Sequence, residues 1–429
     1  MDQITIAIIG LIVLFAIMLL KMPISFSMFI VGFLGLVVVA SPRAAYNVLT
    51  ADLWTQFSSY TMSVIPLYIL MGEIVYRTGV TDSLFQAAYK WVGQFRGGMA
   101  STVILASAGF SAVCGSNAAT SAAMGTMALP ELKKYKYDDV LSTGTIAAGG
   151  TLGILIPPST VLLVIALQTE QSVRELLVAS VIPGVILTVL FLGTVFYLCT
   201  RNPEMGPAGP QTSLKEKLSS LTGVIPTLFL FAFVIGGLFL GWFTPTESGA
   251  FGAFGSLVIA AVMGKLNLKN LGEALNSTIK SSCMVITLMI SAMVFSRFLA
   301  ITMLPNAVVE WTNSLQVAPV LILSTILIIF VIGGALMDAL GFLIIAIPIF
   351  YPTIISLGYD PLWFSILLCI VTSAGAITPP VGVTVFVTKG FAPETPIMSI
   401  FKGACYYLVA YLIIVVLLTA FPQIVTFVV

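Results

Sequence analysis

Four short segments of this 429-residue chain place glycine, proline and neutral oxygen side chains inside long apolar runs. Two of them, residues 115–121 and 333–341, interrupt apolar stretches near the middle, and residues 149–159 and 372–380 interrupt the stretches that follow. Glycine permits close backbone approach, proline leaves a carbonyl free, and Ser, Thr and Asn add neutral oxygens. Such breaks suit a hard cation, and the helix N-termini at breaks suit an anion.

The candidate ligands are the residues of these breaks. For Na⁺, with about two sites expected, one per interrupted stretch and the break that follows it, the candidates are Ser116, Asn117, Gly150, Gly153, Pro157, Gly334, Asp338, Ser373, Gly375 and Thr378. For a substrate they are Ser116, Asn117, Thr120, Ser159, Asp338 and Arg297. Close helix packing explains any single glycine more simply, but four breaks in matching places favour a binding function.

Charged residues within the apolar stretches are few. Asp338 is isolated at a break, where a buried carboxylate needs a cation or a cluster of donors, and a helix N-cap is the alternative. Glu73 and Arg77 are four residues apart and predict a helix ion pair. Glu247, at the start of an apolar stretch, predicts a capping carboxylate. Arg297 lies near a helix end, where its side chain either reaches the interface or meets a substrate carboxylate.

Composition identifies the elements that position these segments. The chain is 59% hydrophobic and 8% charged, whereas a soluble domain has about 25% charged residues. We therefore predict an all-α polytopic membrane protein embedded in a lipid bilayer. The absence of histidine excludes histidine metal sites and histidine general bases, and the net charge of +1 does not indicate a nucleic-acid partner. The five cysteines are widely spaced in apolar runs and predict free core side chains.

Ten apolar stretches are long enough to cross a membrane, since a spanning helix needs about 20 apolar residues. They are residues 4–20, 24–40, 57–76, 141–167, 176–199, 222–242, 248–264, 282–301, 361–387 and 403–426. Two further stretches, 99–130 and 317–356, are broken near the middle and predict re-entrant helical hairpins. Residues 83–95 and their counterpart near residues 308–315 predict amphipathic helices, either interfacial or packed on protein.

The basic residues orient these spans. With the N-terminus outside, ten crossings and two hairpins place 15 of the 18 Lys and Arg residues inside and three, Arg43, Arg174 and Arg297, outside. This asymmetry is the one that the positive-inside rule expects. We therefore predict a multi-pass membrane protein with both termini on the outer side.

Proline and glycine landmarks recur at an almost constant offset of 222 residues, as in Pro130 with Pro352 and Gly153 with Gly375. Each half holds five crossings and one hairpin, so the halves have opposite orientation and form inverted repeats. The predicted units are a first repeat at residues 1–200, a cytoplasmic linker at residues 201–221 and a second repeat at residues 222–429.

The positions of the candidate ligands predict that one part of the protein moves during transport while another part stays fixed. The hairpins and broken spans carry the candidate ligands, so we expect them to form one transport domain. Spans near residues 4–40 and 222–264 are rich in large apolar side chains and are expected to form the scaffold. Inverted repeats allow one site to face either side of the membrane.

Several segments resemble the large membrane subunit of TRAP transporters, the DctM/SiaM-like permeases with an ion-transporter-type fold. They are Ile65-Pro66-Leu67 through Gly72-Glu73, Gly115-Ser116-Asn117-Ala118-Ala119-Thr120, Gly149–Ser159, Phe243–Glu247 and Ile377-Thr378-Pro379-Pro380. The resemblance runs from the third span almost to the end. It implies a Na⁺-driven elevator importer of organic acid anions in the bacterial inner membrane, where both predicted outer termini would be periplasmic. It also implies a small four-helix membrane subunit, expected as a separate chain, and a periplasmic substrate-binding protein.

The first hairpin tip departs from the more usual Gly-Ser-Ser-Pro of that family, because it reads Gly115-Ser116-Asn117-Ala118. This departure favours the sialic-acid branch over the C4-dicarboxylate branch.

Three other functions compete with this interpretation. A standalone Na⁺- or H⁺-coupled symporter of the same fold would need no binding protein, and purification with a small membrane subunit would distinguish the two. A membrane enzyme would need a catalytic dyad, which the sequence does not offer. A channel would have no need for paired hairpins.

Overall fold

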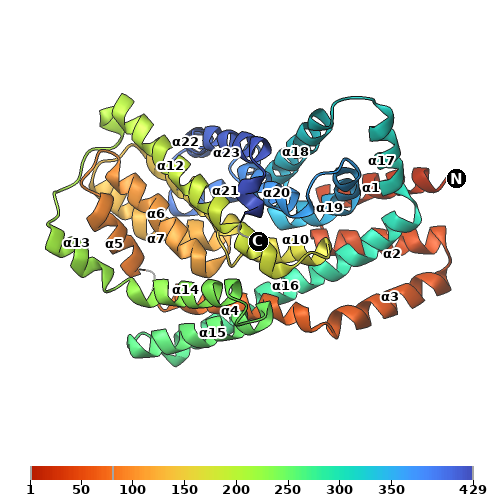
Figure 1. The fold of residues 1–429 in the computed structure, drawn as a ribbon, viewed down its shortest axis with the longest axis horizontal. Coiled ribbons are helices and arrows are strands. Elements are labelled where there is room, and N and C mark those ends of the chain that lie inside the picture. Colours follow the sequence, from red (N-terminus) through yellow and green to blue (C-terminus); the bar gives the residue numbers. More distant parts are fainter. Residues whose placement is uncertain (1, 80–81, 428–429) are drawn as a thin grey trace.

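The computed structural model describes residues 2–79 and 82–427, and these residues form helices and connecting turns without strands (Figure 1). Those up to residue 201 are α1 (Gln3–Leu19), α2 (Ile24–Val39), α3 (Pro42–Phe57), η1 (Tyr60–Ser63), α4 (Val64–Arg77), α5 (Asp82–Val92), α6 (Gly98–Cys114), α7 (Asn117–Lys134), α8 (Asp139–Gly150), α9 (Leu152–Leu155), α10 (Thr160–Gln168), α11 (Val173–Ala179) and α12 (Val181–Arg201).

The remaining helices begin in the predicted linker. They are η2 (Pro203–Met205), α13 (Leu214–Leu221), α14 (Ile225–Phe239), α15 (Pro245–Val262), α16 (Leu268–Ile301), α17 (Leu304–Ser314), α18 (Pro319–Leu336), α19 (Ala339–Ser356), α20 (Pro361–Gly375), α21 (Val383–Phe391), α22 (Ile397–Cys405), α23 (Leu408–Ala420) and α24 (Gln423–Thr426).

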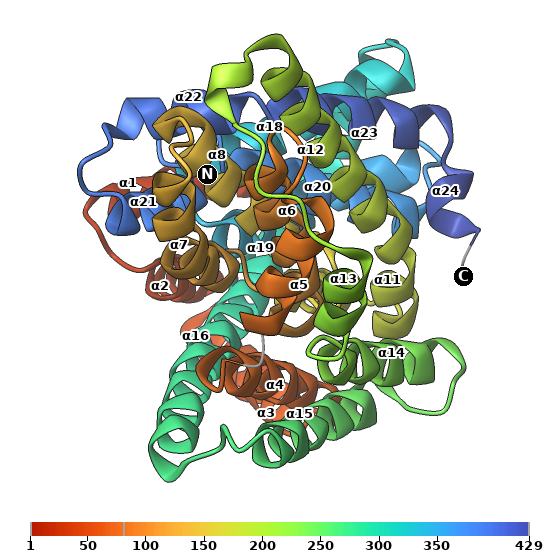
Figure 2. The ribbon, with the colours of Figure 1, turned by 90° about the vertical axis from the view of Figure 1, so that its left-hand side faces the viewer.

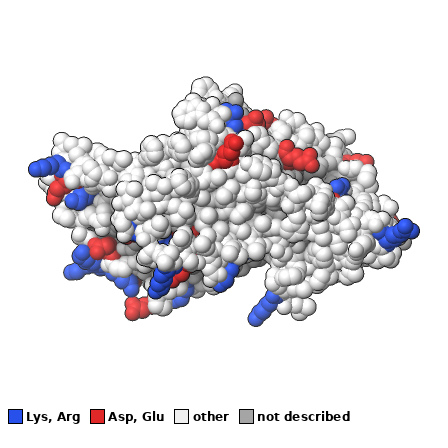
Figure 3. Space-filling view, turned by 90° about the horizontal axis from the view of Figure 1, so that it is seen from below, with Lys and Arg blue, Asp and Glu red and all other residues white. Residues whose placement is uncertain are grey.

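Several of these helices suit a membrane. Among the described residues, five helical segments are long and apolar enough to cross one, or up to eight if each of three bent pairs is one span. The bent pairs are Pro42–Phe57 with Tyr60–Arg77, Asp139–Leu155 with Thr160–Gln168, and Leu214–Leu221 with Ile225–Phe239. Figure 3 shows a face that is largely free of charge, with most of its Lys and Arg side chains toward one end. The chain is a multi-pass membrane protein, and ten crossings stay a prediction.

Both predicted hairpins contain two helices separated by a break at the expected place. In the first, α6 ends at Cys114 and Gly115 takes a left-handed conformation with φ of 63°, which glycine adopts readily. In the second, α18 ends at Leu336 and Asp338 caps the start of α19. Each break therefore brings a helix C-terminus and a helix N-terminus to one point of the fold.

The two spans that follow the hairpins are also interrupted as predicted. The first divides into α8, α9 and α10 and bends by 42°. The second stops with α20 at Gly375 and resumes with α21 at Val383. The peptide bonds Pro157–Pro158 and Pro379–Pro380 at these breaks are both cis.

Buried apolar side chains form two main cores in the described part of the chain. The larger one joins the hairpin arms to the broken spans and to α12, α22 and α23. The second joins α1 and α2 to α16, with side chains from α4, α10 and α19 at its edge. Figures 1 and 2 agree in placing α3, α4, α14 and α15 together along the lower side of the molecule.

Local predictions for single charged residues are confirmed. Glu247 completes a capping box with Thr244 at the start of α15. The carboxylate of Glu73 accepts from Arg77 Nε at 3.0 Å.

The predicted amphipathic segment forms helix α5, which packs against the linker. Trp91 of this helix donates its indole N–H to the carbonyl of Lys217 at 3.2 Å.

Three elements differ from the sequence prediction. Helix α3 was not expected, because polar residues such as Asn47, Asp52 and Gln56 interrupt its apolar pattern; Ser41 caps it by accepting from Ala44 N. Helix α16 runs for 34 residues instead of beginning near residue 282, because its first turns are polar but still helical. The predicted linker contains the short helix α13, which has its own capping box.

Candidate functional site

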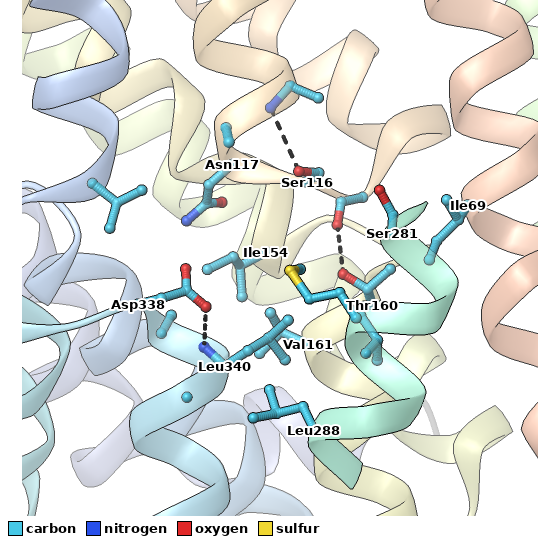
Figure 4. A pocket seen from close by; sticks show the side chains of 18 of the residues that line it. Ile69, Ser116, Asn117, Ile154, Thr160, Val161, Ser281, Leu288, Asp338 and Leu340 are labelled. Carbon is cyan, nitrogen blue, oxygen red and sulfur yellow. Dashed lines mark hydrogen bonds between the residues drawn. The ribbon is translucent and has the colours of Figure 1, made fainter. Parts of the chain in front are cut away.

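A cavity of about 440 Å³ lies where the two hairpin tips meet α2, α4 and α16 (Figure 4). Its walls include tip residues from both hairpins and side chains from those three helices. The polar lining residues are Ser25, Glu73, Cys114, Ser116, Asn117, Thr160, Ser281 and Asp338. Ser116 and Asn117 of the first tip and Asp338 of the second thus line one cavity, although the two tips are more than 200 residues apart in the sequence.

The first hairpin contributes the N-terminus of α7. Ser116 caps this helix by accepting from Ala119 N at 3.5 Å, and Thr160 of α10 donates to the carbonyl of Gly115 at 3.3 Å. Asn117 Oδ1 is buried and has no hydrogen-bond partner among the described residues. Because an unpaired buried oxygen costs free energy, Asn117 is suited to receive a ligand.

The second hairpin contributes the N-terminus of α19 and a carboxylate. Asp338 accepts from Leu340 N at 3.2 Å, so its predicted alternative role as an N-cap is present. The described residues offer it no ion-pair partner within bonding distance. Figure 4 shows Asp338 and Asn117 extending from opposite hairpins toward the same space.

Each hairpin tip packs against the helix break that follows it. A Cβ atom at Gly153 would lie 2.7 Å from the carbonyl oxygen of Ser116, and one at Gly150 would lie 3.2 Å from that of Asn117 and would overlap the Ser121 hydroxyl. The backbone contact at position 153 requires glycine there, and Gly150 packs closely against Asn117 and Ser121. The first tip and the first break therefore bring several backbone and side-chain oxygens together.

The second tip and the second break pack in a similar way. A Cβ atom at Gly375 would lie 2.7 Å from the carbonyl oxygen of Val331, and one at Gly334 would lie 3.0 Å from that of Thr372. Val381 N, within the second break, donates to the carbonyl of Ala335 at 3.0 Å. The glycines predicted as ligands therefore allow close approach of backbone oxygens here as well.

Other predicted ligands support the breaks. Thr120 donates to the carbonyl of Ser116 at 2.8 Å, and Ser159 caps α10. Ser373 and Thr378 donate to carbonyls one turn earlier in their own segment. Pro157 directly precedes Pro158, whose carbonyl oxygen lies against Gly115.

Arg297 is placed apart from this group. Its guanidinium pairs with Asp52 of α3 at 3.4 Å, and it is not among the residues that line the cavity. The unexpected helix α3 supplies this partner.

Some lining residues were not predicted as site residues. Glu73 was interpreted only as the partner of Arg77, yet its carboxylate also borders the cavity; Ser25 and Ser281 border it from α2 and α16. Of the charged lining residues in the described chain, Glu73 and Asp338 are acidic and none is basic. For both serines, the one feature of the sequence that could have predicted a site role is a small hydroxyl side chain within a membrane-spanning stretch.

Comparisons with known proteins agree with this architecture. The sequence model of the family described as "Tripartite ATP-independent periplasmic transporter, DctM component" matches residues 11–424. A C4-dicarboxylate TRAP transporter large permease protein from Pseudomonas aeruginosa is 33% identical over 377 residues, which cover 88% of each chain. The sialic acid TRAP transporter large permease protein SiaM from Vibrio cholerae is 26% identical over 94% of this chain and 93% of its own.

Solved structures show the same fold. The YdaH transporter of Alcanivorax borkumensis superposes with a TM-score of 0.62 at 18% identity, over 90% of both chains. MtrF of Neisseria gonorrhoeae superposes with a TM-score of 0.52 at 13% identity, over 96% of this chain and 94% of its own. The profile match over nearly the whole length, together with the 33% identity, shows that this chain belongs to the DctM family of tripartite ATP-independent periplasmic transporters, as a large membrane permease rather than an enzyme.

Proposed function

We propose that this chain is the large subunit of a Na⁺-coupled TRAP importer that carries an organic acid anion by an elevator movement. One observation carries the proposal: two hairpin tips, each packed against a helix break, meet at one cavity that holds an unpaired carboxylate. Broken helices at such a place present helix N-termini to an anion and free carbonyls to a cation.

The cavity suits an acid anion only when cations accompany it. The N-termini of α7 and α19 open onto it and carry partial positive charge. The negative charges of Glu73 and Asp338 would repel a bound anion. Of these two carboxylates, only that of Glu73 has a basic partner among the described residues, Arg77. A cation near Asp338 would remove this repulsion, which makes symport with Na⁺ the arrangement that the charges favour.

The expected ion positions are the two contacts between tip and break. At the first, oxygens of Ser116 and Asn117 face Gly150 and Gly153. At the second, Asp338 and the carbonyls beside Gly334 and Gly375 are available. Hard cations bind oxygen ligands of these kinds.

The names of relatives support the proposed substrate type, an organic acid anion. Their names include C4-dicarboxylate and sialic acid transporters, and both substrates are carboxylates. The small membrane subunit and the periplasmic binding protein of such systems are proposed as partners, and the bacterial inner membrane as the location.

The proposal is tested by uptake into proteoliposomes that contain this chain and its small membrane subunit, with the binding protein added outside. Radiolabelled succinate and sialic acid serve as probes. An inward Na⁺ gradient should drive uptake of one of them. Equal uptake under a K⁺ gradient would refute Na⁺ coupling, and full uptake on a proton gradient alone would make Asp338 a proton carrier. Uptake without either partner would favour the standalone symporter.

The orientation is tested by cysteine labelling. The terminal residues 1, 428 and 429 lie outside the described residues, so the probe is the exposed Gln423, which lies beyond the end of α23 at Ala420 although the predicted crossing ran to residue 426. In a cysteine-free background, Gln423→Cys should react with an impermeant maleimide in intact spheroplasts, whereas Ser219→Cys in the linker should react only after permeabilisation. The reverse pattern would contradict periplasmic termini.

Replacing Asn117 by leucine should weaken substrate binding while leaving membrane insertion intact. Leucine has a similar volume but no group to bond a charged ligand, and such a hydrogen bond is worth about 1.5–3 kcal/mol. The KM for uptake should therefore rise about tenfold or more. Asn306→Leu, on the exposed side of α17, is the matched control. An unchanged KM at normal membrane abundance would remove Asn117 from the site.

A further inference from the structure

Helix α13, in the linker between the two halves of the chain, leaves its apolar side uncovered. Leu214 is 70% and Leu218 is 55% exposed, and Leu221 is exposed as well. These leucines are four and three residues apart, so they share one side of the helix. A helix on the surface of a soluble protein turns such a side toward the core, but no described part of this chain covers it.

The apolar side of α13 continues onto the helix that follows. Ile225 and Leu228 of α14 are exposed and come four and seven residues after Leu221, and Thr222 and Val224 between the helices keep helical backbone angles. Together the two helices form one of the bent pairs that suit a membrane span, with 50° between them. Because exposed apolar side chains of a span face lipid, bilayer lipid is the occupant that this continuous surface favours.

Charged residues are placed around α13 in the pattern of a helix at a membrane surface. At about 100° per residue, Lys215 and Lys217 lie on either side of the leucines, whereas Glu216 and Ser219 lie away from them. Neither lysine forms an ion pair with a described residue. The carboxylate of Glu216 is engaged in the capping box with Ser213. Both ammonium groups are therefore available to anions from outside the chain.

Helix α5 places an aromatic side chain beside α13. Trp91 is exposed, and its indole N–H donates to the carbonyl of Lys217 at 3.2 Å. Tryptophan is enriched where membrane meets water, since its ring is apolar and its N–H is polar. Figures 1 and 2 both show α13 next to α5, at the end of the molecule where Figure 3 shows most of the Lys and Arg side chains of its face.

We propose that α13 lies in the headgroup region of the membrane and binds anionic phospholipid, with its leucines among the acyl chains and Lys215 and Lys217 on the phosphates. Amphipathic helices with basic residues beside an apolar side bind anionic bilayers in this way. Each lysine near the surface strengthens the preference for anionic over neutral lipid about fivefold. The inference depends neither on Na⁺ coupling nor on the transported substrate.

Spin labels test the position of the helix. The full-length chain, with its five native cysteines replaced, carries one label at Leu218→Cys or at Ser219→Cys and is placed in nanodiscs of phosphatidylcholine and phosphatidylglycerol. Molecular oxygen concentrates in lipid, and a nickel chelate stays in water. Oxygen should be the stronger relaxing agent at position 218, and the chelate at position 219, which is the matched control on the polar side.

The same measurement distinguishes the other occupants. A label at position 218 that meets the chelate as freely as the one at 219 would place α13 in water and overturn the inference. A label at 218 shielded from both agents would show that protein covers the leucines, as a second copy of this chain would. Oxygen access that is lost when the small membrane subunit is added would assign the surface to that subunit instead of to lipid.

Lipid-borne quenchers test the chemistry of the headgroup. A fluorophore at position 218 is quenched by doxyl-labelled phosphatidylglycerol or by doxyl-labelled phosphatidylcholine, each at the same low content. The anionic lipid should associate about fivefold or more strongly. Lys215→Gln combined with Lys217→Gln should bring the ratio of the two associations to about 1. The matched control, Lys269→Gln combined with Lys402→Gln, removes the same charge from exposed positions outside the linker and should keep the parental ratio.

Two outcomes of the quenching experiment contradict the proposal. A parental ratio near 1 would show that the surface binds lipid without regard to charge. An equal fall of the ratio in both double variants would attribute the preference to the net charge of the protein, and Lys215 and Lys217 would lose their assigned role.

Discussion

A disulfide between Ile24→Cys and Gly341→Cys should stop transport completely. Ile24 begins α2, and Gly341 lies in the first turn of α19, beside the second hairpin tip. A Cβ atom at position 341 would lie 3.6 Å from both Cγ atoms of Ile24, which are bonded to its Cβ, and would overlap Cδ1, which cysteine removes. The Cβ atoms of a disulfide lie about 3.5–4.5 Å apart, so the two positions are near enough to be joined. The crosslink would fix the hairpin to α2, so a hairpin that must travel with the substrate could not move.

The measurement uses a background in which the five native cysteines are replaced. Oxidation should abolish uptake in proportion to the crosslinked fraction, and a reductant should restore it. Each single cysteine variant, oxidised in the same way, should keep the uptake that it shows under reducing conditions. Undiminished uptake by fully crosslinked protein would rule out movement of this hairpin against α2.

Asp338→Asn should raise the half-saturating Na⁺ concentration for uptake about tenfold or more, since interactions with a charged group are worth about 1.5–3 kcal/mol. Asparagine is as good an N-cap as aspartate, so the bond from Leu340 N to residue 338 should survive. The substitution therefore separates the charge at the cavity from the start of α19.

Asp360→Asn is the control for this variant. Asp360 caps α20 by accepting from Trp363 N at 2.8 Å, but it does not line the cavity. The control should keep the Na⁺ dependence of the parent, and the two variants should have similar melting temperatures. If Asp338→Asn transports with parental Na⁺ dependence, its carboxylate is no part of an ion site.

Local chemistry explains why the breaks could be predicted. Gly115 takes a left-handed conformation that glycine adopts readily, and the proline pairs at residues 157–158 and 379–380 remove backbone hydrogen-bond donors, so these positions mark helix ends through their own chemistry. The same holds for Asp338 and Glu247, whose capping bonds reach only two or three residues along the chain. Such features depend little on the rest of the fold.

The cavity wall could not be predicted, because it depends on contacts between distant segments. Ser281 is one of several serines in apolar helices, and only the packing of α16 on α2 and α4 brings it to the site. Arg297 illustrates the opposite case. Its sequence position allowed a role in binding, but α3 places Asp52 beside it. Helix α3 itself was not predicted, because polar residues interrupt its apolar pattern.

The length of α16 has a consequence for what can move. Lys280 and Arg297 of this helix are 17 residues apart, or about 26 Å along its axis, which is close to the roughly 30 Å of hydrocarbon in a bilayer. A vertical shift of α16 would draw one charge into hydrocarbon, at a cost of about 2.5–3.5 kcal/mol at the centre. If α16 stands upright in the bilayer, these two charges would resist a change in its depth.

The arms of the second hairpin carry no such restraint. Between Pro319 and Ser356 the only charged side chain is Asp338, at the tip. Changing the depth of these arms exchanges one apolar contact for another, whether with lipid or with α2. In a bilayer, the free-energy cost of a vertical displacement would therefore be larger for α16 than for the arms of the second hairpin, and the positions of Lys280, Arg297 and Asp338 set this difference.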